Sequence, residues 1–357
     1  MRNHNKIIIF LVMGFIFAFF LWNLAGTTTE YSVSERRVLA SFPEISFENI
    51  MSGEFATQFE KYATDRFPIR DAWRSIKAYT QTKVFRQKDN NDIYTASGHI
   101  SKLEYPMNIE MMDHSIQLFT KIKDKYLDSN PIYFAIIPDK NRYLASPNDY
   151  LSLDYEAFAQ YMKEHMNFAE YIEIADLLEA DDYYKTDTHW RQEAIIDVSE
   201  RIASKMGTNI TQSYHTNTLD SPFYGVYAGQ SALVCEPDTI MYLTNDTIES
   251  AEVDGDVLIY DITKAGSKDP YEMFLSGNQP IIRIRNAQNE SGKQLIMFRD
   301  SFGSSIAPLF IKGYSEIVLV DLRYISSEVL DEYVEFENAD ILFLYSTLLL
   351  NNSLSMK

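Results

Sequence analysis

Four short, strongly apolar segments constrain the fold of this chain more than any other feature of its sequence. Each is about as long as one strand, and segments with helical patterning lie between them. Strands that are buried on both faces have continuous apolar runs, and their alternation with helices is typical of a parallel sheet covered on both sides. We therefore predict an α/β fold with three layers, α/β/α, around a mainly parallel sheet. The four segments span residues 130–140, 293–301, 315–322 and 340–348.

The segments between these strands carry helical signals. Residues 191–206 repeat apolar side chains at helical spacing and are followed by Gly207, a typical helix stop. Residues 326–339 begin with a serine that can cap a helix. Two further segments are expected to be helical, namely 153–167 and 302–313. A third segment, 171–178, fits either a strand or a helix.

Residues 210–290 interrupt this alternation. They contain short apolar stretches such as "GDVLIYDITKAG" and "QPIIRIRNA", separated by turn residues, so we expect short antiparallel strands. We interpret the region as a β-rich insertion beside the C-terminal edge of the sheet, where α/β folds bind ligands. Within it, "FYGVYAG" (223–229) is a candidate surface for stacking sugar rings, although tyrosines packed in a core are the more common reason for such a pattern.

An uncharged apolar run fills residues 7–26, after two cationic residues in residues 1–6. As one helix, this run is long enough to cross the roughly 30 Å hydrocarbon core of a bilayer. Trp22 lies near its far end, where aromatic anchors are common. The positive flank predicts that residues 1–6 are cytoplasmic and that the rest of the chain lies outside. A cleaved signal peptide, with "LAG" as a weak cleavage site, is the alternative to an uncleaved anchor.

We divide the chain after residue 26 into two parts. Residues 27–90 are expected to form an extracytoplasmic segment, and residues 91–357 the main domain. The first of these includes "SERRVLASFPEIS", which we expect to be extended. A helix follows and is expected to break at Pro68, because proline removes a backbone hydrogen bond and clashes with the preceding turn. The alternation of strands and helices therefore falls within residues 91–357.

The composition excludes several classes of function. The net charge of −19 over 357 residues argues against nucleic-acid binding, because neutralising phosphates needs clustered Lys and Arg. Cys235 is the only cysteine, so neither an internal disulfide nor a thiolate metal cluster can form. Asp181 and Asp182 lack companion histidines for a metal site, and no phosphate loop or dinucleotide fingerprint is present. We expect no cofactor.

Two short motifs carry the residue types needed for acyl-transfer chemistry. In "KTDTHWRQEA" (185–194), Asp187 and His189 are two residues apart, so both side chains point to the same side of an extended loop. In "MFRDSFGSS" (297–305), Ser301 follows an apolar strand and precedes a helix whose first N–H groups can stabilise an oxyanion. A serine nucleophile needs a base and a carboxylate that orients this base. The three residues are therefore a candidate catalytic triad.

Both motifs also have a purely structural interpretation. A Thr or Asp in "TDTHW" can cap the helix that follows, and Ser301 can cap the next one. Spacing alone does not decide between capping and catalysis, since each motif is common by itself.

Taken together, the motifs resemble those of the AlgX/AlgJ-type alginate O-acetyltransferases and of the related DHHW proteins, which are SGNH-hydrolase-like. "DTHW" is followed about 110 residues later by an apolar strand that ends in "RDSF". "ERRVLASFPEIS", "GEFATQFEKYATDRFPIRD" and "VDLRY" (320–324) are similar to other segments of that group. The resemblance covers residues 35–350 and keeps the order Asp, His, Ser along the chain.

The resemblance implies a role for each member of the triad. Ser301 is expected to be the nucleophile that accepts an acetyl group, His189 the general base, and Asp187 the residue that orients the base. Three further residues are candidates for binding substrate or stabilising the oxyanion. They are Arg323 in "DLRY", Tyr345 at the end of the last strand, and Asp300. An ion pair for the arginine and a packed strand end for the tyrosine are the structural alternatives.

The chain departs from the family pattern at two places. Arg299 stands where the serine motif usually has a glycine, and Glu193 precedes Ala194 where the group often has a glycine. Neither change removes a member of the triad. Arg299 nevertheless calls into question the backbone geometry around the oxyanion.

By resemblance, the reaction is O-acetylation of an extracellular polysaccharide, and a membrane-bound O-acyltransferase partner delivers the acetyl donor across the membrane. The domain is then expected outside the cell membrane, tethered by residues 7–26. Two alternatives remain open. One is a carbohydrate acetyl-esterase that uses the same triad with water as acceptor, and the other is a non-catalytic subunit for polysaccharide binding or assembly. Transfer requires a site that excludes water and binds a sugar.

Overall fold

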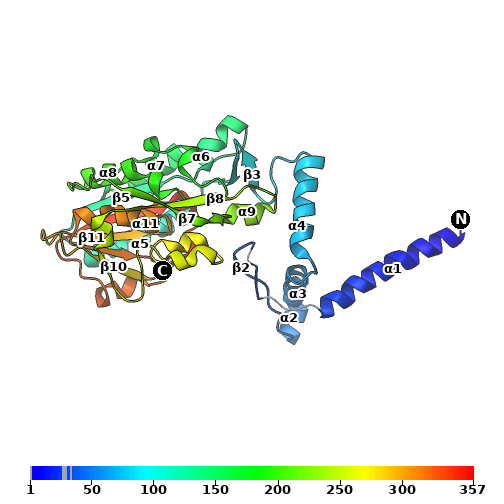
Figure 1. The fold of residues 1–357 in the computed structure, drawn as a ribbon. Helices are drawn as coiled ribbons and strands as arrows, with labels where there is room; N and C mark the ends of the chain where they lie inside the picture. The colour runs from blue at the N-terminus through cyan, green and yellow to red at the C-terminus, as the bar shows by residue number, and fades with distance from the viewer. Residues whose placement is uncertain (1, 26–29, 33) are drawn as a thin grey trace. The chain divides into compact units, whose positions relative to one another are not determined.

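The computed structural model describes residues 2–25, 30–32 and 34–357. The chain divides into two compact units (Figure 1). The small unit consists of Met1–Asn91 with Ala228–Val234, and the large unit of Asp92–Tyr227 with Cys235–Lys357.

A seven-stranded sheet forms the centre of the large unit, in the order β6-β5-β13-β11-β12-β10-β9. The five strands from β6 to β12 are parallel to one another, whereas β10 runs antiparallel to both of its neighbours. The predicted α/β fold with a mainly parallel sheet is therefore confirmed. The strands are β5 (Ile132–Ile137), β6 (Glu170–Tyr171), β9 (Glu252–Val253), β10 (Ile281–Arg285), β11 (Gln294–Arg299), β12 (Glu316–Val320) and β13 (Ala339–Ser346).

Both faces of this sheet are buried. Since successive side chains of a strand point to opposite sides of the sheet, each strand contributes to the core on both sides. In β11, Leu295 and Met297 pack in one hydrophobic cluster, whereas Ile296 and Phe298 pack in a second. Helices supply the other side of each cluster, which explains the continuous apolar strands. The covering helices are α8 (Ile196–Lys205) in the first cluster, and α5 (Ile109–Tyr126) and α7 (Tyr155–His165) in the second.

The region 210–290 agrees only in part with the β-rich insertion predicted for it. β7 (His215–Phe223) and β8 (Asp238–Thr244) form a separate antiparallel pair. β9 and β10, in contrast, extend the main sheet instead of lying beside it. Ile282 and Ile284 of β10 are buried, so this strand contributes to the main core.

The stretch "GDVLIYDITKAG" (255–266), expected as a strand, forms a single bridge at Tyr260 and then the 3-10 helix η6 (Ile262–Gly266). The side chain of Asp261 accepts a hydrogen bond from the N–H of Thr263 and so caps this helical turn. Local capping by an Asp side chain competes with strand formation, which explains the wrong prediction.

Two predicted helices are present but shorter than expected. The helix expected over 191–206 begins at Ile196, after the 3-10 turn η5 (Gln192–Ala194). In the segment 326–339, all of which the structure describes, the only helical part is the 3-10 helix η9 (Ser327–Glu332), in which the backbone of Val329 is not helical. Ser326 caps it as predicted, since its side chain accepts the N–H of Glu328.

The other predicted segments can be located directly. Residues 171–178 contain the end of β6 and the 3-10 turn η3 (Ala175–Leu177), and residues 302–313 form α11 (Phe302–Ile306) and η8 (Ala307–Gly313). The remaining elements after residue 91 are β3 (Ile93–Ala96), β4 (His99–Lys102), α6 (Asn141–Leu144), η2 (Ser146–Asn148), η4 (Ala180–Asp182), α9 (Val226–Ser231), α10 (Asp246–Glu249), η7 (Pro270–Met273), α12 (Thr347–Leu350) and η10 (Ser353–Ser355).

The predicted membrane span at residues 7–26 coincides with α1 (Arg2–Ala25), and its last residue, Gly26, lies outside the described residues. Within the part of the chain that the structure describes, no helix has both the length and the hydropathy needed to cross a membrane. The membrane anchor therefore stays a prediction.

The helix break predicted at Pro68 is confirmed, because α3 (Glu54–Asp65) and α4 (Arg70–Tyr79) lie on either side of it. Arg37 donates two hydrogen bonds to the carboxylate of Asp65 at the end of α3 and lowers its pKa to about 2. The remaining elements of the small unit are β1 (Tyr31–Ser32), β2 (Arg37–Val38), α2 (Phe47–Ser52) and the π-helix η1 (Thr80–Val84).

Candidate active site

Three side chains meet where β11 ends. Ser301 Oγ lies 2.8 Å from His189 Nε2, and His189 Nδ1 lies 2.6 Å from Asp187 Oδ1. The structure thus brings together the three residues of the candidate triad. Asp187 and His189 are buried, whereas Ser301 is partly exposed. A substrate can therefore reach the hydroxyl, while the imidazole and the carboxylate are shielded from water.

The capping interpretation of the two motifs is not supported by these contacts. The side chain of Ser301 makes no capping hydrogen bond to α11, every residue of which is described. The N-cap residue of η5 is Arg191, not a residue of "TDTHW". The side chains of Asp187 and Ser301 are instead directed to His189.

The backbone around Asp187 holds its carboxylate in place. Oδ1 accepts a second hydrogen bond, from the N–H of His189 (3.1 Å), and Oδ2 accepts one from the N–H of Val226 (2.8 Å). The neighbouring Gly225 allows this approach, because a Cβ added there would lie 2.3 Å from the Cβ of Asp187. The role of Gly225 could not be predicted from the sequence, since this residue is 38 positions from Asp187.

Lys140 fixes the loop that carries Asp187. Its Nζ donates hydrogen bonds to the carbonyl oxygens of Tyr184 (2.8 Å), Lys185 (3.1 Å) and Asp187 (2.7 Å). Burial lowers the pKa of Lys140 to about 8. Three carbonyl acceptors require three N–H donors, which only the ammonium form provides. The buried charge is thus compensated by the loop that it holds.

Tyr271 of η7 covers the imidazole ring. The ring centroids of His189 and Tyr271 are 3.8 Å apart, and the two planes differ by only 10°. The Tyr271 hydroxyl donates a hydrogen bond to Ser305 Oγ at 2.8 Å. Tyr271 could not be predicted from the sequence, because "DPYEM" around it carries no pattern that distinguishes it from the other 23 tyrosines.

Trp190 directly follows His189 in the sequence. It is fully buried in the main hydrophobic cluster, and its Nε1 donates to Ser305 Oγ (2.9 Å) and to the carbonyl of Phe302 (3.2 Å). Trp190 thus joins the "DTHW" loop to helix α11, and the ring stacked on the histidine is that of Tyr271.

Asp300 shapes the turn that presents Ser301. Its Oδ1 accepts the N–H of Phe302 (3.0 Å), and its Oδ2 accepts the N–H of Ser346 (2.8 Å) at the end of β13. The N–H of Gly303 donates to the carbonyl of Asp300 (3.0 Å). The N–H groups of Phe302 and Gly303, expected to face an oxyanion, are therefore used inside the turn.

Arg299, the departure from the family pattern, is fully buried. Its Nη1 donates to the carbonyl of Asp300 (3.3 Å) and lies 3.5 Å from a carboxylate oxygen of Asp321, while Nε and Nη2 have no hydrogen-bond partner among the described residues. Gly303 makes room for this side chain, because a Cβ added there would lie 2.6 Å from the Cβ of Arg299. The turn therefore accommodates an arginine where the family usually has glycine.

The other two candidates lie near this arginine. Arg323 donates to both carboxylate oxygens of Asp321, at 2.9 and 2.6 Å, so it forms an ion pair with a buried partner. Tyr345 is buried in the second hydrophobic cluster, and burial raises its pKa. Its hydroxyl has no hydrogen-bond partner within the described chain.

The "FYGVYAG" segment forms no stacking surface, because Phe223 and Tyr227 are buried and only Tyr224 is exposed among its aromatic residues. The hydroxyl of Tyr227 donates to Asp139 and contacts Thr188 Oγ1, both at 3.2 Å. The more common explanation, tyrosines packed in a core, is therefore confirmed here.

Comparisons with known proteins agree on the fold. No protein-family model matches the chain, and no curated protein matches it in sequence. A DHHW family protein from Eubacterium siraeum has a similar structure, with a TM-score of 0.63 and 20% identity over 75% of this chain and 94% of that chain. Bacillus cereus PatB1 gives a TM-score of 0.56 and 17% identity over 73% of this chain and 97% of its own. The O-acetyltransferase domain of Pseudomonas putida AlgJ gives a TM-score of 0.44 and 11% identity over 74% of this chain and 93% of that chain. The first two matches confirm, at the level of the fold, the resemblance to the DHHW group.

Proposed function

We propose that this protein is an O-acetyltransferase that acetylates a polysaccharide outside the cytoplasm through an acetyl-serine intermediate. The observation that carries the proposal is the unbroken chain of hydrogen bonds from Asp187 through His189 to Ser301. This arrangement makes a weak hydroxyl nucleophilic, because the base lies within reach and is oriented by a buried carboxylate. The motifs shared with acetyltransferases and the fold shared with the DHHW protein support the same chemistry.

In the first half-reaction, Ser301 Oγ attacks the carbonyl carbon of an acetyl donor and its proton moves to His189 Nε2. The resulting imidazolium is stabilised by Asp187, which accepts the hydrogen bond from Nδ1. The tetrahedral intermediate then loses the donor's leaving group, which takes the proton from His189. The products are acetyl-Ser301 and the free donor carrier.

In the second half-reaction, a sugar hydroxyl attacks the acetyl carbon while His189 Nε2 takes its proton. The C–O bond to Ser301 breaks, and Ser301 Oγ recovers the proton from the imidazolium. The acetyl group leaves on the sugar. Attack by water instead would release acetate, which is the reaction of an esterase.

The location of the reaction follows from α1 in this proposal. An uncleaved helix at the N-terminus would tether the large unit outside the cell membrane, and a membrane-bound O-acyltransferase partner would supply the acetyl group from the cytoplasmic side. The uncharged run at residues 7–26 and the cationic residues before it support this orientation.

The test uses the full chain in detergent with p-nitrophenyl acetate as donor. We expect release of p-nitrophenol and, in intact-mass spectra, a species heavier by one acetyl group. Ser301→Ala and His189→Ala should lose both signals. A sulfonyl fluoride should block the same residue, and the structure of PatB1 with a sulfonyl adduct makes this reagent a natural choice.

Added oligosaccharides then separate the two reactions. Acetyl groups found on the sugar identify a transferase, whereas an unchanged yield of acetate identifies an esterase. If the wild-type chain shows neither acetylation nor ester turnover, but binds glycan as well as Ser301→Ala does, the catalytic proposal is wrong and a binding subunit is the better description.

A further inference from the structure

The segment from Lys61 to Lys88 in the small unit has an unusual charge for this protein. It contains eight Lys or Arg and only two Asp, a net charge of +6 in a chain whose net charge is −19. Lys77, Lys83 and Arg86 are exposed. The segment is therefore a cationic region on an otherwise strongly acidic protein.

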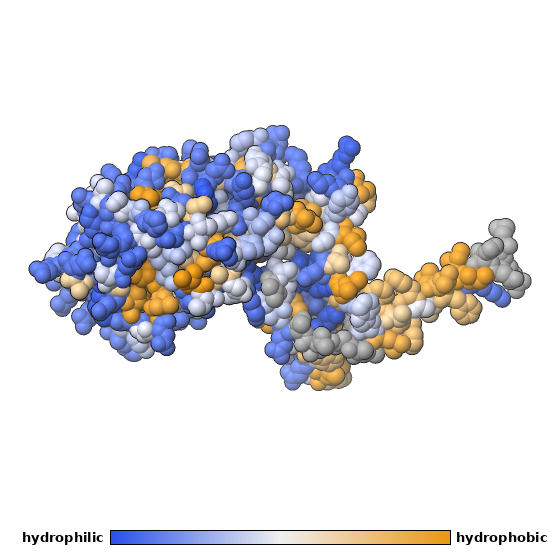
Figure 2. All heavy atoms as spheres, in the orientation of Figure 1, coloured by the Kyte–Doolittle hydropathy of each residue, from blue (hydrophilic) through white to orange (hydrophobic). Residues whose placement is uncertain are grey.

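The same segment exposes large apolar side chains. Ile76 is 54%, Val84 61% and Phe85 68% exposed, and Trp73 is 39% exposed. Single exposed apolar residues are common on protein surfaces, but several between residues 73 and 85 indicate a surface that contacts something apolar. Figure 2 shows hydrophobic side chains over part of α4 and along α1 on the face in view.

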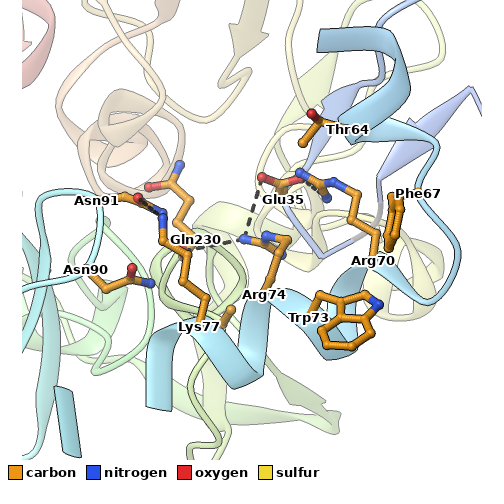
Figure 3. A pocket seen from close by; sticks show the side chains of 11 residues that line it. Glu35, Thr64, Phe67, Arg70, Trp73, Arg74, Lys77, Asn90, Asn91 and Gln230 are labelled. Carbon is orange, nitrogen blue, oxygen red and sulfur yellow. Dashed lines mark hydrogen bonds and ion pairs between the residues drawn. The ribbon is translucent and has the colours of Figure 1, made fainter. Parts of the chain in front are cut away.

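The two kinds of side chain occupy neighbouring faces of α4. Ile69, Trp73 and Ile76 are spaced by four and three residues, and Arg70, Arg74 and Lys77 repeat the same spacing one position later. In Figure 3, Arg70 and Arg74 reach toward Glu35, whereas Trp73 extends away from it. Arg70 Nη1 lies 2.5 Å and Arg74 Nη2 lies 3.5 Å from the Glu35 carboxylate. These two ion pairs fix the orientation of α4.

A cavity of about 440 Å³ opens beside this helix and combines both features (Figure 3). Its lining includes the cations Arg70, Arg74 and Lys77 together with the aromatic rings of Phe67 and Trp73. Aromatic rings next to long cationic side chains are typical of the boundary between lipid headgroups and acyl chains, where the rings are buried and the charges reach the headgroups.

We propose that residues 61–88 lie on the surface of an anionic lipid bilayer, with Trp73, Ile76, Val84 and Phe85 immersed. The neighbouring exposed cations then lie at the headgroups, namely Lys77, Lys83, Arg86 and Lys88. The excess of cations matches anionic lipids, while the remaining residues, with a net charge of −25, would be repelled by them. Contact with α1 gives continuity with the predicted anchor, since Phe19 stacks on Phe67 with centroids 5.6 Å apart.

A second copy of the chain fits this surface less well. The centres of protein interfaces are depleted of lysine, whereas Lys77 and Lys83 stand within the apolar pattern. Two copies that paired through this segment would also bring like charges together. The bilayer is therefore the occupant to which we commit.

The test measures the depth of single positions in the full chain. In a Cys235→Ser background, a nitroxide label is placed at Ile76→Cys or Phe85→Cys, and at Gln160→Cys in α7 as an exposed control in the large unit. Each protein is reconstituted into vesicles of phosphatidylcholine with or without phosphatidylglycerol. Power saturation then compares access of oxygen, which is enriched in lipid, with access of a nickel chelate, which stays in water.

We expect labels at 76 and 85 to be more accessible to oxygen than to the chelate when phosphatidylglycerol is present, and the label at 160 to show the reverse. Replacing Lys77, Lys83, Arg86 and Lys88 by Gln should shift positions 76 and 85 toward water, while ester turnover and the Tm stay unchanged. The proposal is wrong if both labels are as accessible to the chelate as position 160. It is also wrong if their spectra show spin–spin broadening that unlabelled chain dilutes away, since that result identifies a second copy. Ester turnover is measured separately, so failure here leaves the proposed chemistry intact.

Discussion

The ring of Tyr271 lies parallel to the imidazole of His189 at a centroid distance of 3.8 Å. This contact blocks one face of the base and limits rotation of its ring, so Nε2 stays directed at Ser301. It also places the face of an aromatic ring against a group that becomes cationic during acyl transfer. Such a contact stabilises the imidazolium more than the neutral ring.

Removal of the Tyr271 ring is therefore expected to slow ester turnover. A cation–π contact contributes about 0.5–2 kcal/mol, so Tyr271→Leu should lower kcat by roughly two- to thirtyfold. Tyr271→Phe keeps the ring and loses only the hydrogen bond to Ser305, so its kcat should stay close to wild type. Tyr333→Leu, at an exposed tyrosine of the same unit, serves as control. Equal losses in the Phe and Leu variants would show that the hydroxyl, not the ring, is responsible.

Gly225→Ala is expected to disturb Asp187 directly. The added Cβ would come within 2.4 Å of both Cα and Cβ of Asp187, so backbone must move. Overpacking of this kind costs about 1–3 kcal/mol, and the shift should also lengthen the hydrogen bond to His189. We expect a lower Tm and at least a tenfold lower kcat. The matched control is Gly266→Ala, where a Cβ meets nothing within 4 Å. If both variants retain wild-type turnover, Asp187 does not depend on this close approach.

The origin of each side chain explains how much of the site could be predicted. The triad lies in two contiguous motifs, and the apolar strands around Ser301 have runs that identify them without tertiary information. Gly225, Tyr271 and Lys140 come from distant segments, and only the folded chain brings them to Asp187 and His189. The helix expected after Ser326 was overestimated for a different reason, because a capping serine predicts where a helix begins and does not reveal the non-helical backbone at Val329.

Glu104 is expected to make stability depend on pH. It is buried, and its Oε2 accepts hydrogen bonds from Tyr155 (3.1 Å) and Thr347 (3.0 Å). Burial, and next the nearby Asp139, raise its pKa from 4.5 to about 8, although the hydrogen bonds from Thr347 and Tyr155 and, to a smaller extent, the charge of Lys102 lower it. A raised pKa in the folded state means that the unfolded chain releases this proton first as pH rises. The contribution of Glu104 to stability is therefore complete below pH 4.5 and is lost as pH rises through about 8.

Glu104→Gln tests this directly, because glutamine keeps an acceptor for both hydroxyls and does not titrate. Thermal unfolding from about pH 5 to 8.5 should show a smaller decrease of Tm in the variant than in the wild type, and the variant should be the more stable of the two at the upper end. Parallel curves for the two proteins would mean that Glu104 does not titrate in this range.

Arg299 and Arg323 share Asp321 unequally, and their replacement by methionine should reveal the difference. Arg323 donates two hydrogen bonds to Asp321 at 2.9 and 2.6 Å, whereas Arg299 is 3.5 Å away and leaves two nitrogen atoms unpaired among the described residues. Replacing a buried, poorly paired charge by an apolar side chain of similar length is often neutral or stabilising, whereas removing the main partner of a buried carboxylate costs on the order of 3 kcal/mol. We expect Arg299→Met to keep the Tm and ester turnover of the wild type, and Arg323→Met to lower the Tm markedly. A loss of turnover at unchanged Tm in Arg299→Met would instead show that the guanidinium acts on the substrate, in spite of its burial.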